Sequence, residues 1–202
     1  MTSLSTDYNH DHNHVHLAGN DTTNDYAKEK GSVTLAVLSD THGPMREAAQ
    51  GLHDVLAASA CDYIVHAGDS QSEPDLAALE TIAPLLAVRG NCDWKPSLSY
   101  LPAVLKRRLG NTLLVMTHKP ADLTKALQLT RTEAAGAAFV LGVHGHTHVP
   151  ELIEQGDGTI ILCPGSPTEP RGGSEPCIAV VTIAPECADA APRVSFKSLQ
   201  DI

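Results

Sequence analysis

The sequence predicts an α/β fold in which two β-sheets pack against each other and helices cover their outer faces. From Gly31 onwards, apolar runs of strand length alternate with stretches of helical length that are rich in Ala and Leu. The first half follows a strand–helix–strand order, which is typical of a parallel sheet. The last third is rich in strand-like runs and Gly-containing turns, so it predicts hairpins.

Each expected element has a local signal. The run VTLAVL at 33–38 is too short for a helix and rich in β-branched residues, which favours a strand. Pro44 opens the first helix, Pro74 lies in the first turn of the second, and Gly136 can end the third. We expect strands at 33–38, 62–67, 84–89, 112–117 and 137–143, helices at 44–59, 73–82 and 121–136, and hairpin strands within 151–163, 177–184 and 193–199.

Two parts of the chain differ in composition. Residues 31–202 are predicted to form a single domain, whereas residues 1–30 are polar, show no period and are predicted to be disordered. In this tail, His10, His12, His14 and His16 lie at every second position. Metal capture or delivery is the alternative to a passive tail.

Composition and charge narrow the class of protein. The chain of 202 residues is 42% hydrophobic and only 3% aromatic, so its core must consist mainly of aliphatic side chains. The net charge of -10 argues against a nucleic-acid partner and against an anionic membrane surface. Five cysteines form no CxxC pair, and neither a signal peptide nor an apolar run of about 20 residues is visible. These features predict a cytoplasmic protein.

Polar side chains that can bind metals follow each of the five expected strands. The carboxyl ends of the strands form the ligand crevice of an α/β sheet, so we expect these side chains to converge. The candidates are two Asp, one Asn and four His: Asp40, His42, Asp69, Asn91, His118, His146 and His148. Such a set suits Mn, Fe, Zn, Ni or Co, and it is large enough for two ions that share Asp69.

Other readings exist for single residues. One Asp or His at a strand end is more often a cap than a ligand, and only the conjunction of five strand ends favours a metal site. His53 is expected at the surface, His66 in the core or behind the ligands, and His144 in packing. Asp93 is expected to hold its loop, while Trp94 either walls the pocket or packs in the core.

The ordered motifs resemble those of the calcineurin-like metallophosphoesterases. These motifs are DTH at 40–42, GD at 68–69, GNCD at 90–93, His118 in MTHKP, and GHTH at 145–148. The resemblance covers residues 33 to 185. It is strongest to the YfcE-type phosphodiesterase branch, to which the retromer scaffold subunit is also related, because of the Cys in GNCD and the segment CPGSPTEPR at 163–171.

The resemblance implies a four-layer α/β/β/α sandwich of two mixed sheets flanked by helices. It also implies two divalent ions, most readily Mn²⁺, with Fe, Ni, Zn, Co or Mg as alternatives, and attack on a phosphodiester by a metal-bridging hydroxide. One ion would be held by Asp40, His42, Asp69 and His148, and the other by Asp69, Asn91, His118 and His146. Partners would be a small phosphodiester substrate and copies of the chain in a homodimer or homotetramer.

The family pattern also assigns catalytic and substrate-binding roles, and one residue departs from it. Asp69, Asn91, Cys92 and His118 would be catalytic, and Asn91 and Cys92 would also meet the substrate. The segment PGSPTEPRGG at 164–173 is a candidate rim of the substrate site, where Ser166 and Arg171 would meet a phosphate; the alternative is a plain Pro/Gly turn between strands. Cys92 replaces the His of most members; a thiol titrates near 8.5 rather than near 6.5 and carries no positive charge. It is therefore either a weaker proton donor or a small packed residue. The alternative function is a protein-interaction scaffold of the same fold with little or no catalysis.

Overall fold

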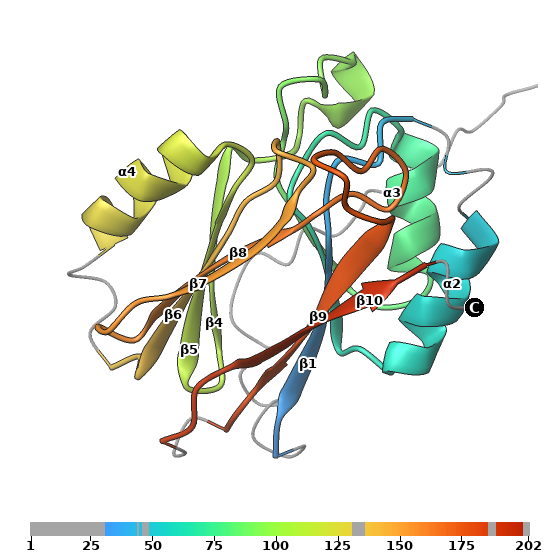
Figure 1. The fold of residues 1–202 in the computed structure, drawn as a ribbon. Helices are drawn as coiled ribbons and strands as arrows, with labels where there is room; N and C mark the ends of the chain where they lie inside the picture. The colour runs from blue at the N-terminus through green and yellow to red at the C-terminus, as the bar shows by residue number, and fades with distance from the viewer. Residues whose placement is uncertain (1–30, 44, 46–48, 131–135, 186–188, 200–202) are drawn as a thin grey trace, which may run out of the picture.

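Two β-sheets pack face to face in the computed structural model, which describes residues 31–43, 45, 49–130, 136–185 and 189–199 (Figure 1). The first sheet has the strand order β10-β9-β1-β2-β3 and the second has the order β4-β5-β6-β8-β7. The strands are β1 (Val33–Leu38), β2 (Tyr63–His66), β3 (Leu85–Ala87), β4 (Val104–Leu109), β5 (Thr112–Thr117), β6 (Phe139–Val143), β7 (Pro150–Glu154), β8 (Thr159–Pro164), β9 (Cys177–Ile183) and β10 (Arg193–Ser198).

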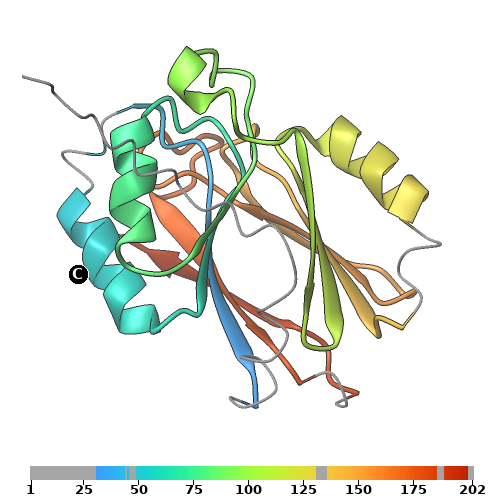
Figure 2. The ribbon, with the colours of Figure 1, turned by 180° about the vertical axis from the view of Figure 1, so that it is seen from behind.

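Helices cover the outer face of each sheet. The described helices are α2 (Ala49–Ser59), α3 (Glu73–Glu80) and α4 (Pro120–Thr130), with a short 3-10 helix η1 at Pro96–Leu98. Helices α2 and α3 lie on the first sheet and α4 lies on the second, as the view from behind also shows (Figure 2). None of the described helices has the length and apolar content needed to span a bilayer.

The central strands are apolar throughout because both of their faces are buried. In β1, Leu35 and Val37 point into the core between the sheets, whereas Ala36 and Leu38 pack under the helices. This alternation follows from the two-residue period of a strand. The expected four-layer α/β/β/α sandwich is therefore confirmed.

The pairing of the strands explains why five strand ends meet at one place. Strands β1, β2 and β3 run parallel in the first sheet, and β5, β6 and β8 run parallel in the second. The expected hairpins are present as β7–β8 and β9–β10. In Figure 1 the loops after the parallel strands gather at the upper end of the sandwich.

The structure differs from the sequence prediction in a few elements. Strand β4 at Val104–Leu109 is not among the expected strands, yet it pairs along its whole length with β5. The third strand covers only Leu85–Ala87 of the predicted 84–89, and α4 begins one residue earlier than predicted, at Pro120. The tail, the predicted helix start at Pro44 and residues 131–135 of the third predicted helix lie outside the described residues.

Candidate metal centre

The predicted ligands converge in two clusters at the carboxyl ends of the strands. The ligand atoms of Asp40, His42 and His148 lie within 4.8 Å of one another, and we name these residues the first ligand group. The corresponding atoms of Asp69, His118 and His146 also lie within 4.8 Å, and we name these the second ligand group.

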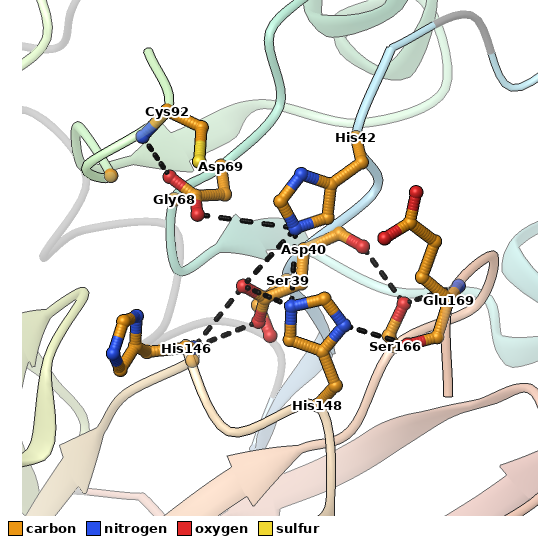
Figure 3. Close-up of polar contacts among 12 residues, drawn as sticks. Ser39, Asp40, His42, Gly68, Asp69, Cys92, His146, His148, Ser166 and Glu169 are labelled. Atoms are coloured by element: carbon orange, nitrogen blue, oxygen red, sulfur yellow. Dashed lines mark hydrogen bonds and ion pairs between the residues drawn. The ribbon is translucent and has the colours of Figure 1, made fainter. Parts of the chain in front are cut away.

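Asp69 connects the two ligand groups. Its Oδ2 lies 3.2 Å from His118 Nε2 and 3.9 Å from His42 Nε2. Its Oδ1 accepts a hydrogen bond of 2.7 Å from the backbone N–H of Cys92 (Figure 3). The carboxylate therefore faces both groups while its position is fixed from the loop after β3.

The first ligand group is compact, and two of its three members, Asp40 and His148, are buried. His148 Nε2 lies 3.4 Å from Asp40 Oδ1 and 3.1 Å from His42 Nε2, and the two imidazole rings stack at 4.9 Å. The Asp40 carboxylate also accepts the backbone N–H of His146, at 2.9 Å to Oδ2. Three nitrogen and oxygen ligands thus point at a common centre, the donor set that first-row divalent metals prefer.

The backbone is strained where it presents these ligands. Among the described residues, left-handed φ angles occur at Asp40 (56°), His42 (46°), Asp69 (58°), His146 (73°) and His148 (59°). Non-glycine residues rarely adopt this region, and such strain concentrates at functional sites. The chain turns sharply after β1, β2 and β6, and these turns direct the side chains inward.

Two glycines allow the carboxylates to approach the neighbouring loops. A Cβ at Gly145 would lie 2.6 Å from Asp40 Oδ2, and a Cβ at Gly90 would collide with Asp69 Oδ1. Any side chain at either position would displace a carboxylate. The glycines beside the ligands in GNCD and GHTH are therefore explained by the lack of space for a Cβ.

Backbone carbonyls orient two of the histidines. His118 Nδ1 donates to Ala67 O at 2.8 Å, and His148 Nδ1 donates to Glu169 O at 2.6 Å. This fixes the tautomer and leaves the Nε2 lone pair of each ring free to bind a metal. His118 Nε2 is buried and has no hydrogen-bond partner, an arrangement that a divalent ion would satisfy. The residues present therefore fit a metal centre.

The charges of the second group depend on one another. Burial alone raises the pKa of Asp69, but the adjacent His118 ring and the hydrogen bond from the Cys92 backbone lower it well below its usual range. Burial alone lowers the pKa of His118, but the Asp69 carboxylate raises it above its ordinary value. Asp69 is therefore an anion at all ordinary pH values, as a bridging ligand must be.

The remaining predicted ligand and the cysteine lie at the exposed side of the centre. Asn91 is exposed, and its amide donates to Cys92 Sγ at 3.2 Å. Burial, together with the hydrogen bond and charge of Asp69, raises the pKa of the Cys92 thiol. Cys92 therefore stays protonated and neutral near pH 7. It lies close enough to His42 and Asp69 to join a ligand cluster.

The turn after β8 contacts the backbone of the first ligand group through Ser166. The Ser166 hydroxyl is fully buried, donates to Asp40 O at 2.8 Å and accepts the backbone N–H of Glu169. This hydroxyl is therefore engaged with the backbone beside Asp40, and the predicted contact of Ser166 with substrate stays a prediction. Arg171 is exposed beside the same turn, and its substrate contact stays a prediction.

The structure also places the other residues that the sequence analysis discussed. Asp93 holds its loop as expected, since its carboxylate accepts the backbone N–H of Asp69, Gln71 and Gly90 at 2.7 to 2.9 Å. Trp94 is 78% exposed, so core packing is excluded. His66 is buried and contacts the Thr41 hydroxyl at 3.2 Å from behind the ligands.

Two further histidines lie where the sequence analysis expected them, whereas several hydrogen-bond partners of the ligands were not predicted. His144 is buried and faces Glu151 at 3.8 Å, and the side chain of His53 is 61% exposed, both as expected. Sequence reasoning missed Gln71 and the carbonyls of Ala67 and Glu169. A backbone acceptor has no sequence signal; for Gln71, its place two residues after Asp69 is the one hint.

Comparisons with known proteins agree with this geometry. Residues 33–186 match the family model of the calcineurin-like phosphoesterase superfamily domain. A probable metallophosphoesterase of Methanothermobacter thermautotrophicus (strain Delta H) is 35% identical over 162 residues, which cover 77% of this chain and 89% of the relative.

Solved structures show the same similarity. A predicted phosphoesterase from Streptococcus pneumoniae TIGR4, known from a crystal structure, is 29% identical with a TM-score of 0.64. The match covers 84% of this chain and 91% of the other. Vacuolar protein sorting 29 from Cryptosporidium parvum is 17% identical with a TM-score of 0.62, covering 82% of this chain and 97% of the other. The second likeness concerns the fold alone.

Proposed function

The chain belongs to the calcineurin-like phosphoesterase superfamily, as its ordered motifs predicted, and on this premise we propose that it is a dinuclear metal-dependent phosphodiesterase. The observation that carries the proposal is the position of Asp69 between the two ligand groups. One carboxylate that faces two clusters of nitrogen and oxygen ligands is suited to hold a pair of ions.

We assign four ligands to each ion. The first ion would be held by Asp40, His42, Asp69 and His148, and the second by Asp69, Asn91, His118 and His146. Bound divalent ions polarise the phosphoryl oxygens and lower the pKa of water, so that a hydroxide nucleophile exists at neutral pH. Carboxylate and imidazole ligands without thiolate favour Mn²⁺, with Fe, Ni, Zn, Co or Mg as alternatives.

The residues of the open side determine how a phosphate would be held. The Asn91 amide and the Cys92 thiol are neutral donors beside Asp69. A neutral thiol cannot offset the second negative charge of a phosphomonoester as an imidazolium would, and it protonates a poor leaving group weakly. This favours singly charged diesters with good leaving groups over monoesters.

The proposal extends to the substrate's size and the protein's surroundings. A net charge of -10 disfavours a polyanion such as nucleic acid, so we propose a small phosphodiester in the cytoplasm. We also propose a homodimer or homotetramer, which sedimentation would test.

Hydrolysis of two model esters tests the function. Bis-p-nitrophenyl phosphate and p-nitrophenyl phosphate are compared with added Mn²⁺ for the wild type, Asp69→Asn and the surface control Asp122→Asn. We expect preferred turnover of the diester, retained in Asp122→Asn and abolished in Asp69→Asn. Faster turnover of the monoester would contradict the diesterase. Metal binding without any turnover would support the alternative, a protein-interaction scaffold of the same fold.

A further inference from the structure

Gln71 contacts the back of one metal-ligand candidate through its side chain. Its amide Nε2 lies 2.6 Å from His42 Nδ1, on the side of the ring away from Asp40 and Asp69. The corresponding atoms of His118 and His148 bind backbone carbonyls instead. His42 is thus the one of these three histidines whose supporting partner is a side chain that the sequence can change.

The backbone of Gln71 is held so firmly that the side chain has a defined direction. Its N–H donates to Asp93 Oδ1 at 2.7 Å, and its carbonyl accepts Lys95 Nζ at 2.7 Å. Its φ of 60° lies in the left-handed region, which Gln rarely adopts. A strained and doubly anchored residue beside a ligand indicates a position selected for where it places its side chain.

An amide can provide what a ligating histidine needs at its second nitrogen. To bind a metal through Nε2, His42 must carry its proton on Nδ1, and that proton needs an acceptor. The Gln71 amide offers both a donor and an acceptor, and half a turn of the amide exchanges them at the same position. Its oxygen can therefore accept from Nδ1–H and hold the ring in the ligating tautomer.

From these contacts we infer that Gln71 is the positioning residue of His42 and sets the affinity of the first ligand group for its ion. The inference rests on the proposed dinuclear centre. It predicts that the two ions respond differently to changes at Gln71. The Gln71 side chain contacts His42 of the first group, whereas its link to the second group runs only through Asp93, which holds the backbone of both Gln71 and Asp69.

Calorimetric titration with Mn²⁺ alone tests this inference without any activity assay. The full chain is used with His10, His12, His14 and His16 changed to Ala, so that the tail does not compete for the metal. The central variant is Gln71→Gly, because glycine keeps the left-handed backbone and removes only the amide. We expect two ions in the parent chain and an affinity for one of them that falls by about 10-fold to 100-fold in Gln71→Gly.

Two further variants separate positioning from general support of the fold. Gln71→Glu retains an acceptor for Nδ1–H, so we expect it to restore or strengthen the binding that Gln71→Gly loses. Lys95→Ala removes the hydrogen bond to the Gln71 carbonyl but leaves the amide, so we expect binding of both ions to persist. Circular dichroism of each variant shows whether it is folded.

The outcomes distinguish the inference from the function on which it rests. Two unchanged affinities in Gln71→Gly, or binding in Gln71→Glu as weak as in Gln71→Gly, would overturn the role of the amide while leaving the dinuclear centre intact. A parent chain that binds no Mn²⁺ would overturn the proposed metal centre and this inference together.

Discussion

Asp69 of the second ligand group also faces His42 of the first, yet the two groups differ in how firmly the protein holds them. In the first group Asp40 and His148 are at most 2% exposed, and the turn that contains Ser166 braces them. In the second group His146 is exposed, and the neighbouring Asn91 is exposed as well. For the proposed pair of ions, we therefore expect the first group to hold its ion tightly and the second to exchange its ion more readily, on the side where a substrate can approach.

The largest expected effect separates the two groups directly. We expect His148→Ala to lower kcat/KM for the diester on the order of 1000-fold, about 4 kcal/mol of lost transition-state stabilisation, and added Mn²⁺ should not restore it. His146→Ala should cause a smaller loss that millimolar Mn²⁺ recovers. Kinetics at several Mn²⁺ concentrations measure both, and equal losses in the two variants would contradict the difference between the groups.

The next effect concerns the loop that holds Asp69. Asp93 is buried and accepts three backbone N–H groups, so Asp93→Asn turns one acceptor into a donor that faces them. We expect the free energy of unfolding to fall by about 3 kcal/mol in a urea titration. Asp122→Asn, an exposed Asp on α4, serves as the control and should stay within about 0.5 kcal/mol of the wild type. A stable Asp93→Asn would show that the loop does not depend on this carboxylate.

The pH dependence of stability tests the support behind the first group. Burial lowers the pKa of His66 to about 4 from its ordinary value of 6.5, even though Asp93 and Asp40 oppose the shift. Between pH 6.5 and 4, His66 is therefore protonated in the unfolded chain but stays neutral in the folded chain. The free energy of unfolding falls as the pH falls through this window.

For His66 we expect a loss of about 2 kcal/mol between pH 7.5 and pH 5, measured by urea unfolding. Asn at this position keeps an acceptor but does not titrate, so His66→Asn should remove this part of the pH dependence. An unchanged pH profile in the variant would show that His66 is not the group responsible.

The smallest effect distinguishes bracing from substrate contact. Ser166→Ala removes the hydrogen bond to Asp40 O, and we expect a loss of about 1 kcal/mol in unfolding free energy with an unchanged KM. A raised KM with an unchanged free energy of unfolding would instead show that Ser166 contacts the substrate. Arg171→Ala, at the exposed end of the same turn, is the matched comparison and should raise KM.

The central strands could be predicted from the sequence because they are buried on both faces. Short continuous apolar runs such as VTLAVL at 33–38 are typical of strands that are buried on both faces. Strand β4 was harder to recognise, since its Lys106, Arg107 and Arg108 interrupt the apolar pattern at a sheet edge. Strand β4 pairs with β5 in a hairpin whose two-residue turn is Gly110-Asn111, a local signal that the sequence analysis did not use.

The ligand candidates could likewise be predicted, but most of their supports could not. Asp40, His42 and Asp69 follow strands and carry metal-binding atoms, so position and chemistry both pointed to them. The carbonyls that orient His118 and His148 belong to Ala67 and Glu169, and any residue type would supply the same atom. The Ser166 hydroxyl suggested a phosphate contact in the sequence. Its direction toward Asp40 O is set by the folded turn, which the sequence alone does not show.

Anomalous diffraction from crystals grown with Mn²⁺ tests the central claim, that Asp69 joins two metal sites, most directly. We expect two peaks about 3.5–4 Å apart, one on each side of the Asp69 carboxylate. One should be surrounded by the first ligand group and the other by the second. A single peak, or peaks that Asp69 does not contact, would contradict the dinuclear centre.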